Sequence, residues 1–234
     1  MKKITVLLLA VFVGLTTLSS AQKQFSGVIK SSYKIEGTDD PNILSQIPSE
    51  VETIVLGNKS KTVANFEGGA STIIMDGDKK TQTIIFELNG LGKYFIVVDE
   101  EKVKEKLKNT DLKYDYKDEY MTIAGYKCQK VIITAIDLET DEEQMATAYV
   151  NKDINSTDAH NFAQYPGLMG YTFRVESPIG EGYENAVQIV EIKEINTAKK
   201  IKDIDFLLPS DAKDLFKDTT PEEKMMFGIT DDDE

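Results

Sequence analysis

The amino-acid sequence predicts a mainly β fold of the α+β class, in which most segments form a meander of antiparallel hairpins. Apolar and polar residues alternate along many short segments, as they do in half-buried strands. Pairs such as Gly57-Asn58 and Asn89-Gly90 separate these segments and suit tight hairpin turns. Helical patterns are few and short, so strands should dominate the fold.

The first half of the chain begins with a strand expected over residues 25–35, where the odd positions are mainly apolar. Asp40 and Pro41 then suit the N-cap and the first position of a short helix that runs to about residue 47. Alternation and turn residues next predict five strands, over residues 50–57, 59–66, 71–76, 81–88 and 94–99.

Residues 99–109 show the clearest helical pattern. Glu100 and Glu101 fall in its first turn, which favours the helix dipole. Val103 and Leu107 form a single narrow apolar stripe, so this helix should pack one edge and leave the rest in water.

The second half continues with a hairpin over residues 120–136, which turns at Ala124-Gly125. An acidic turn over 137–143, a strand over 144–150 and a short helix from Ser156 toward Phe162 are expected next. Two further strands should follow, one around 171–175 and a long one over 185–196. The chain should close with an apolar edge packed by 204–209 and a capping box over 220–223.

Several middle strands are apolar on both faces. Within residues 71–76, Ile73 and Met75 share one face, and Ile74 lies on the other. Such strands are usually covered on both sides. Either a helix or second sheet packs over them, or they belong to a curved sheet that lines an apolar cavity, and the residues alone leave both arrangements open.

Residues 1–21 have the pattern of a secretory signal peptide. Lys2 and Lys3 precede an apolar stretch, and small residues end it at Ala21. We therefore expect export to the periplasm or outside the cell after cleavage near Ala21. No linker or repeat divides the remainder, which predicts one domain over residues 22–217 and an acidic tail, 218–234, with one short helix.

Composition argues against several classes of function. A net charge of −13 disfavours nucleic acid as a partner. The chain has one histidine, His160, and one cysteine, Cys128, which are too few for a zinc site. Cys128 lies in an apolar segment and is expected to be buried and inert.

No nucleophile elbow, phosphate loop or dinucleotide fingerprint is present, so we expect no enzyme activity and no cofactor. The acids at 76–78 and 137–141 do not fit the twelve-residue calcium loop, and they suit hairpin turns, so no metal site is expected either.

Binding is the remaining class. Aromatic and apolar residues gather after the central hairpin and are candidates to line a hydrophobic pocket, although such clusters more often form core: Phe162, Tyr165, Leu168, Met169, Tyr171 and Phe173.

Four short segments carry a family resemblance: Ile-Ala-Gly-Tyr-Lys-Cys at 123–128, Ala-Tyr-Val-Asn-Lys-Asp-Ile at 148–154, Tyr-Pro-Gly-Leu-Met-Gly at 165–170 and Phe-x-x-Pro at 206–209. They resemble exported families of unknown function related to the GLPGLI family. Tyr149 stands where that pattern often has tryptophan, and residues 165–169 match the GLPGLI string only in part. The resemblance implies the lipoprotein-carrier fold of the LolA type, a strongly curved antiparallel sheet that forms a half-open barrel with short helices over its concave face.

Two hypotheses of function follow. In the first, the exported protein is no enzyme and binds a lipid or acyl chain in the concave face. In the second, it is an envelope-structural or protein-interaction module whose core is filled by its own side chains, with a cell-envelope protein as partner.

Overall fold

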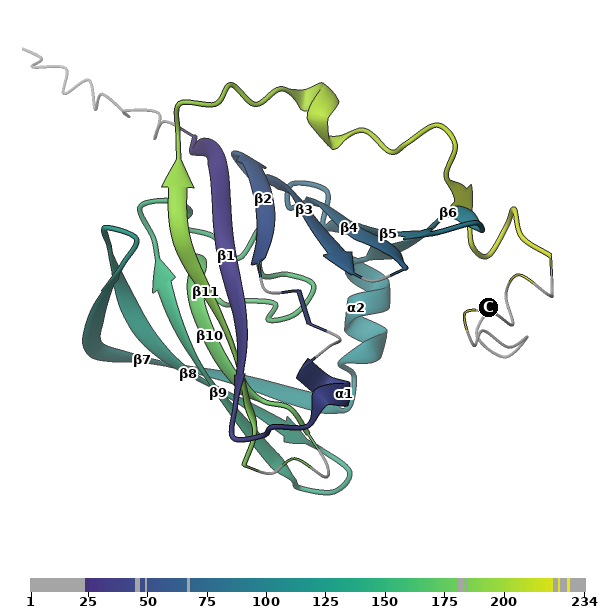
Figure 1. Cartoon of the computed structure of the whole chain (residues 1–234). Helices are drawn as coiled ribbons and strands as arrows, with labels where there is room; N and C mark the ends of the chain where they lie inside the picture. The colour runs from purple at the N-terminus through teal and green to yellow at the C-terminus, as the bar shows by residue number, and fades with distance from the viewer. Residues whose placement is uncertain are drawn as a thin grey trace, which may run out of the picture.

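The computed structural model describes residues 24–44, 47–48, 50–66, 68–180, 183, 185–220, 223 and 227. The expected signal peptide and most of the chain beyond residue 220 lie outside the described residues. Twelve strands form one sheet in the order β12-β6-β5-β4-β3-β2-β1-β11-β10-β9-β8-β7 (Figure 1). Their bounds are β1 Ser26–Glu36, β2 Glu50–Leu56, β3 Lys59–Phe66, β4 Gly69–Asp76, β5 Thr81–Leu88, β6 Gly92–Asp99, β7 Thr110–Ile123, β8 Tyr126–Asp137, β9 Glu143–Asn151, β10 Tyr171–Pro178, β11 Val187–Asn196 and β12 Lys213–Asp214.

The sheet is strongly curved and does not close into a barrel, because β12 and β7 lie at its two edges (Figure 1). β1 joins the two arms, since it pairs with β2 on one side and with β11 on the other. The neighbouring strands are antiparallel except for the short β12, which pairs parallel with β6. The predicted mainly β, half-open antiparallel sheet is confirmed, with this one parallel pair added.

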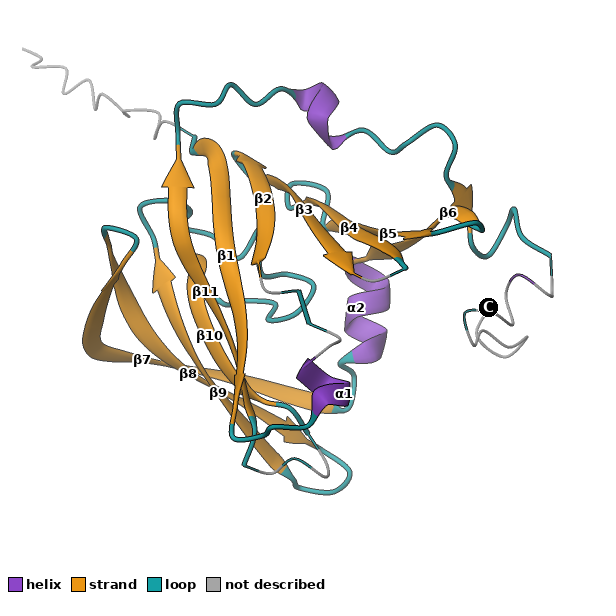
Figure 2. Cartoon of the chain, viewed as in Figure 1, coloured by secondary structure: helices purple, strands orange, loops and turns teal. Residues whose placement is uncertain are grey.

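Helices are a small part of the described chain (Figure 2). They are α1 (Pro41–Leu44), α2 (Glu100–Lys106) and the 3-10 helix η1 (Asp203–Phe206). Figure 1 shows α2 on the inner side of the curve, beside β4 and β5. In the described part of the chain, no helix is long and apolar enough to cross a membrane.

Helix α2 forms where the sequence predicted it. The Asp99 side chain caps it by accepting a hydrogen bond from the Lys102 amide at 2.9 Å. Val103, in the apolar stripe, is 4% exposed. The helix therefore holds its narrow apolar edge against the inside of the sheet.

Three sequence predictions for local structure are wrong. β7 begins at Thr110, ten residues before the predicted strand; its Asp and Lys residues concealed an alternation that keeps Leu112 and Tyr114 half-buried. No helix follows Ser156, because the chain from 152 to 170 makes successive turns. The expected apolar edge near residue 204 faces solvent: Ile204 is 65% and Leu207 63% exposed.

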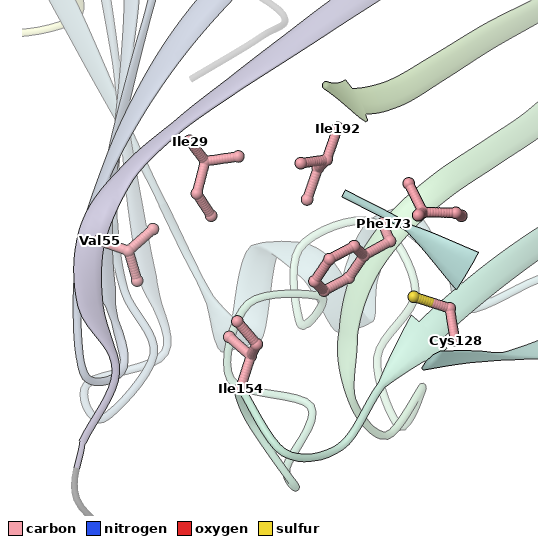
Figure 3. Close-up of a cluster of buried hydrophobic side chains, with 7 residues drawn as sticks. Ile29, Val55, Cys128, Ile154, Phe173 and Ile192 are labelled. Atoms are coloured by element: carbon pink, nitrogen blue, oxygen red, sulfur yellow. The ribbon is translucent and has the colours of Figure 1, made fainter. Parts of the chain in front are cut away.

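Two clusters of buried side chains lie in the β7–β11 arm and at its junction with β1 and β2. The first joins strands of both arms through residues drawn in Figure 3, and the second lies under β8 and β9. The labelled members of the first are Ile29, Val55, Cys128, Ile154, Phe173 and Ile192; the second contains Val131, Ile133, Ala148, Val150 and Leu168. The expected burial of Cys128 is confirmed, because its side chain is fully enclosed.

Candidate ligand-binding cavity

The concave side of the sheet encloses a cavity of about 670 Å³. Its walls come from β1 to β6 on one arm, β10 and β11 on the other, helix α2 and the segment between β9 and β10. This volume lies within the range of small-molecule sites in proteins.

One wall is apolar, and we call it the β4–β6 patch: Ile73, Met75, Ile84 and Val98. Ile73 of β4 lies opposite Ile84 of β5. Gln82, two residues from Ile84 and therefore on the same face of β5, lies opposite Val98 of β6. The strand register thus brings these side chains to one face of the sheet. Val103 and Leu107 of α2 face the same space. All four residues of the β4–β6 patch remain partly accessible, so this wall is not filled by the protein itself.

A second apolar wall, the β10–β11 patch, consists of Phe173, Val175, Val190 and Ile192. Val175 lies opposite Val190, and Val190 lies opposite Tyr33 of β1. Phe173 and Ile192 are buried in the first core cluster, so this wall is continuous with the core.

Hydroxyl groups separate the two apolar patches. Ser31, Thr53, Ser60 and Thr62 line the cavity from β1, β2 and β3. The Thr53 and Thr62 hydroxyl oxygens are 2.8 Å apart and hydrogen-bonded across the β2–β3 pair. The cavity is therefore amphipathic rather than uniformly apolar, which the sequence did not indicate.

The segment 152–170, which we call the bridging loop, connects the two arms across the concave side. At one end the Asn155 amide donates to Asn58 at 3.2 Å, and Lys80 forms an ion pair with Asp158 at 2.8 Å. At the other end the Tyr114 hydroxyl of β7 donates to the Pro166 carbonyl at 2.9 Å. The loop thus fixes the separation between the arms.

Asn161 holds the bridging loop in its folded shape. Its buried amide nitrogen donates to the carbonyls of Leu168 at 2.8 Å and Gly170 at 2.7 Å. Its amide oxygen accepts from the Thr172 hydroxyl at 2.9 Å. One side chain therefore replaces the backbone hydrogen bonds that this turn-rich segment lacks.

His160 lies on the cavity wall at the base of the bridging loop. Its Nε2 is 2.9 Å from the Gly57 carbonyl oxygen, so Nε2 carries the proton and donates it. Its buried Nδ1 has no hydrogen-bond partner among the described residues. Burial lowers the pKa of His160, and the Tyr171 ring packs edge-on against it at 4.9 Å between centroids.

The charges around the cavity are uneven. Among the described lining residues there is no Asp or Glu, whereas Lys106 and Arg174 are present. Arg174 lies opposite Glu191 in the register, and its guanidinium pairs with Glu191 and with Glu176. Lys106 is exposed to solvent, lines the cavity and forms no hydrogen bond or ion pair with any described residue.

A smaller pocket of about 220 Å³ lies between α2 and the bridging loop. Phe162, Val103 and Pro166 line it together with the Lys80–Asp158 ion pair. The Lys80 ammonium lies 5.6 Å from the centre of the Phe162 ring. This pocket is small and flanked by paired charges, and its residues chiefly attach the loop to the helix.

The structure separates the six candidate site residues. Tyr165, Tyr171 and Phe173 line the main cavity, although Phe173 is only 1% exposed. Phe162 lines the smaller pocket instead, and Leu168 belongs to the second core cluster. Met169 is 40% exposed and lines neither space; its amide donates to the Tyr116 hydroxyl at 2.8 Å.

Most of the cavity wall therefore comes from residues that were not named as site residues. The sequence did carry a signal for them: Ile73 and Met75 belong to a strand that is apolar on both faces, as expected for a sheet with a lined concave side. Lys106 carried no such signal, because a lysine on a short helix normally faces water.

Cys128, the one cysteine of the chain, is buried. Burial raises the pKa of the Cys128 thiol to about 11, so the thiol is neutral and its Sγ is 3.5 Å from the Tyr126 carbonyl oxygen. No group of three or more His, Cys, Asp or Glu residues gathers in a metal-binding arrangement within the part of the chain that the structure covers. The prediction that the protein is no enzyme stays a prediction.

Comparison with known proteins gives no family. No family model matches the chain, and no curated protein matches it. Among solved structures it is similar to the crystal structure of MucB, with 9% identity and a TM-score of 0.33; the match covers 82% of this chain and 60% of that chain. A likeness at this TM-score assigns neither family nor function, so the resemblance to the GLPGLI-related families stays a prediction.

Proposed function

We propose that the protein binds the hydrocarbon chain of a lipid or a related amphiphile in its concave cavity. The observation that carries this proposal is the β4–β6 patch, which stays partly accessible inside a cavity of about 670 Å³. Exposed apolar surface inside an enclosed site favours an apolar ligand, because each buried CH₂ contributes about 0.8 kcal/mol. Burial of the hydrocarbon chain alone drives such binding, so no catalytic residue is needed for it.

The amphipathic wall refines this proposal. A ligand with hydrocarbon alone would place apolar atoms against the Ser31 and Ser60 hydroxyl groups in place of water, which costs free energy. A chain that ends in a polar head would use the apolar patch and leave the hydroxyl groups in contact with water or with the head.

Native mass spectrometry tests this proposal. We expect the protein purified from a periplasmic or secreted fraction to carry, or to take up, one amphiphile that organic extraction removes. Ile84→Asp should abolish uptake by placing a carboxylate in the β4–β6 patch. Thr83→Asp is the matched control, because Thr83 is the adjacent residue on the opposite face of β5 and is absent from the cavity wall. A folded Ile84→Asp protein with unchanged uptake would contradict the proposal.

A second candidate function has one observation of its own. Ile204, Leu207 and Leu208 are exposed on the segment between β11 and β12, which favours contact with another protein. In that case the cavity would stay empty, and the Leu207→Glu variant would lose the partner while ligand uptake would be absent in every variant.

Export is part of the same proposal, since a lipid carrier or an envelope module would act outside the cytoplasm. N-terminal sequencing of the protein recovered from the periplasm or medium should begin at Gln22. Recovery of the intact chain from the cytoplasm alone would contradict the proposed export.

A further inference from the structure

The cavity wall excludes one type of charge. The whole chain has 40 Asp and Glu residues against 27 Lys and Arg residues, yet no Asp or Glu lines the cavity within the described chain. A wall taken at random from this sequence would contain more acids than bases. The distribution instead places neutral hydroxyl and amide groups and a lysine around the apolar patches.

Lys106 is the lysine concerned, and its surroundings differ from those of its neighbours. On the same helix, Lys104 forms an ion pair with Glu100 at 3.5 Å. Lys106 has no such partner among the described residues, and it lines the cavity beside Val103 and Leu107. An ammonium group next to an apolar wall is the arrangement that suits the head of an anionic amphiphile.

The other two basic residues of the wall are less suited to bind an anion. Arg174 is neutralised by Glu176 and Glu191 on the opposite face of the sheet. His160 is kept neutral by burial, and its Nε2 proton is used by the Gly57 carbonyl. Lys106 on α2 is therefore the basic lining residue that has no acidic partner among the described residues, and it lines the same cavity as the β4–β6 patch.

We propose that the ligand is a single-chain amphiphile with an anionic head, whose head binds Lys106 and whose chain lies along the β4–β6 patch. This inference rests on the proposed function and specifies its ligand class. Carboxylate and phosphate heads share the required chemistry. The protein's net charge of −13 opposes such a ligand at long range, so binding must come from the local arrangement.

Isothermal titration calorimetry with four ligands that share a sixteen-carbon chain tests the head group: palmitate, palmitoyl lysophosphatidate, hexadecanol and hexadecyltrimethylammonium. We expect an anionic head to bind roughly tenfold more tightly than hexadecanol. The cationic ligand should bind most weakly, even though the net charge of the protein attracts it. Comparison of palmitate with lysophosphatidate distinguishes a fatty acid from a phospholipid.

Substitutions of Lys106 then test whether the head group of the ligand binds there. Lys106→Gln should remove the advantage of the anionic ligand and leave hexadecanol binding unchanged, and Lys106→Arg should retain it. Lys61→Gln is the matched control, since Lys61 lies opposite Ile54 and Ile74 in the register, on the face away from the cavity. The control removes the same net charge and should leave all four affinities unchanged.

The outcomes separate this inference from the proposed function. If all four ligands bind equally, or if the cationic ligand binds best, the anionic head is overturned while chain binding stands. If Lys61→Gln weakens palmitate as much as Lys106→Gln does, the preference arises from overall charge and the Lys106 contact is overturned. If no ligand binds at all, the proposed function itself fails.

Discussion

The two sides of the concave face consist of similar strands, but their inner faces are covered to different degrees. On the β8–β11 side, the bridging loop and the core clusters cover the inner face, and Phe173 and Leu168 are almost fully buried. On the β4–β6 side, Ile73 and Ile84 stay partly accessible beneath α2. The first side has filled most of its concavity with its own chain, apart from the β10–β11 patch, and the second has left space.

The difference lies in what covers the strands and not in the strands themselves. A loop of nineteen residues, 152–170, crosses the filled side, whereas α2 has only seven residues and a single apolar stripe on the open side. A short helix cannot fill the inner face of three strands. The strands that are apolar on both faces, such as β4, belong to a curved sheet and line the cavity, which is the second of the two arrangements that the sequence left open.

The largest expected effect is on stability and differs between the two sides. Phe173→Ala removes a buried ring and should cost about 3–5 kcal/mol of unfolding free energy. Ile84→Ala, on the accessible wall, should cost less than about 2 kcal/mol because less of its surface leaves water on folding. Urea denaturation measures both. Equal losses would contradict the distinction between a filled and an open side.

Asn161→Ala tests how the bridging loop is held. The change leaves the Leu168 and Gly170 carbonyls without their donor, and each unsatisfied buried group costs about 1–3 kcal/mol. We expect lower stability and faster amide exchange in the loop. Asn161→Asp is a sharp companion, since it keeps the shape and the acceptor for Thr172 but removes both donors. If the loop amides stay protected from exchange in both variants, Asn161 does not hold the bridging loop in place.

Gly77→Ala tests the contact between the open arm and the bridging loop. A Cβ at this position would lie 2.5 Å from the Ala159 carbonyl oxygen and 2.6 Å from the Ala159 Cβ. Displacement of the loop should cost about 1–3 kcal/mol and increase amide exchange around Ala159. Gly68→Ala is the control: its Cβ meets no atom within 4 Å, so only the strain of its positive φ remains and loop exchange should not change.

The smallest effect concerns pH. Burial lowers the pKa of His160 in the folded protein, so the unfolded chain binds its proton first as pH falls. Stability is full above the ordinary histidine pKa of about 6.5 and decreases below it until the lower folded pKa is reached, by at most about 1.4 kcal/mol per pH unit. Denaturation at pH 7 and pH 5 should show a larger loss for the wild type than for His160→Gln. An identical loss of stability in the two proteins would show that His160 does not cause the pH dependence.

The fold class was predictable because alternation and turn residues are local signals. Gly57-Asn58 and Asn89-Gly90 mark real turns, and the expected strands from residue 50 to residue 99 appear with small changes at their ends. The early part of β7 was missed because its charges are those of a protected edge strand, in which polar residues conceal the alternation.

The site was less predictable because it depends on register and on long-range contacts. Tyr165, Tyr171 and Phe173 were named from local clustering and do reach the cavity wall, while Leu168 was taken into the core. Nothing local to Lys106 indicates that the curvature of the sheet brings it to the wall. Such residues emerge only when strands distant in sequence are paired.

A tryptophan reporter tests the central claim most directly, because the chain has no tryptophan of its own. Met75→Trp places the reporter in the open wall, and Tyr126→Trp places a matched aromatic beside the first core cluster on the filled side. Addition of a brominated fatty acid should quench the fluorescence of Met75→Trp saturably and much more strongly than that of Tyr126→Trp, which lies behind Phe173. Equal quenching of both reporters, or of neither, would contradict a ligand that lies along the β4–β6 patch.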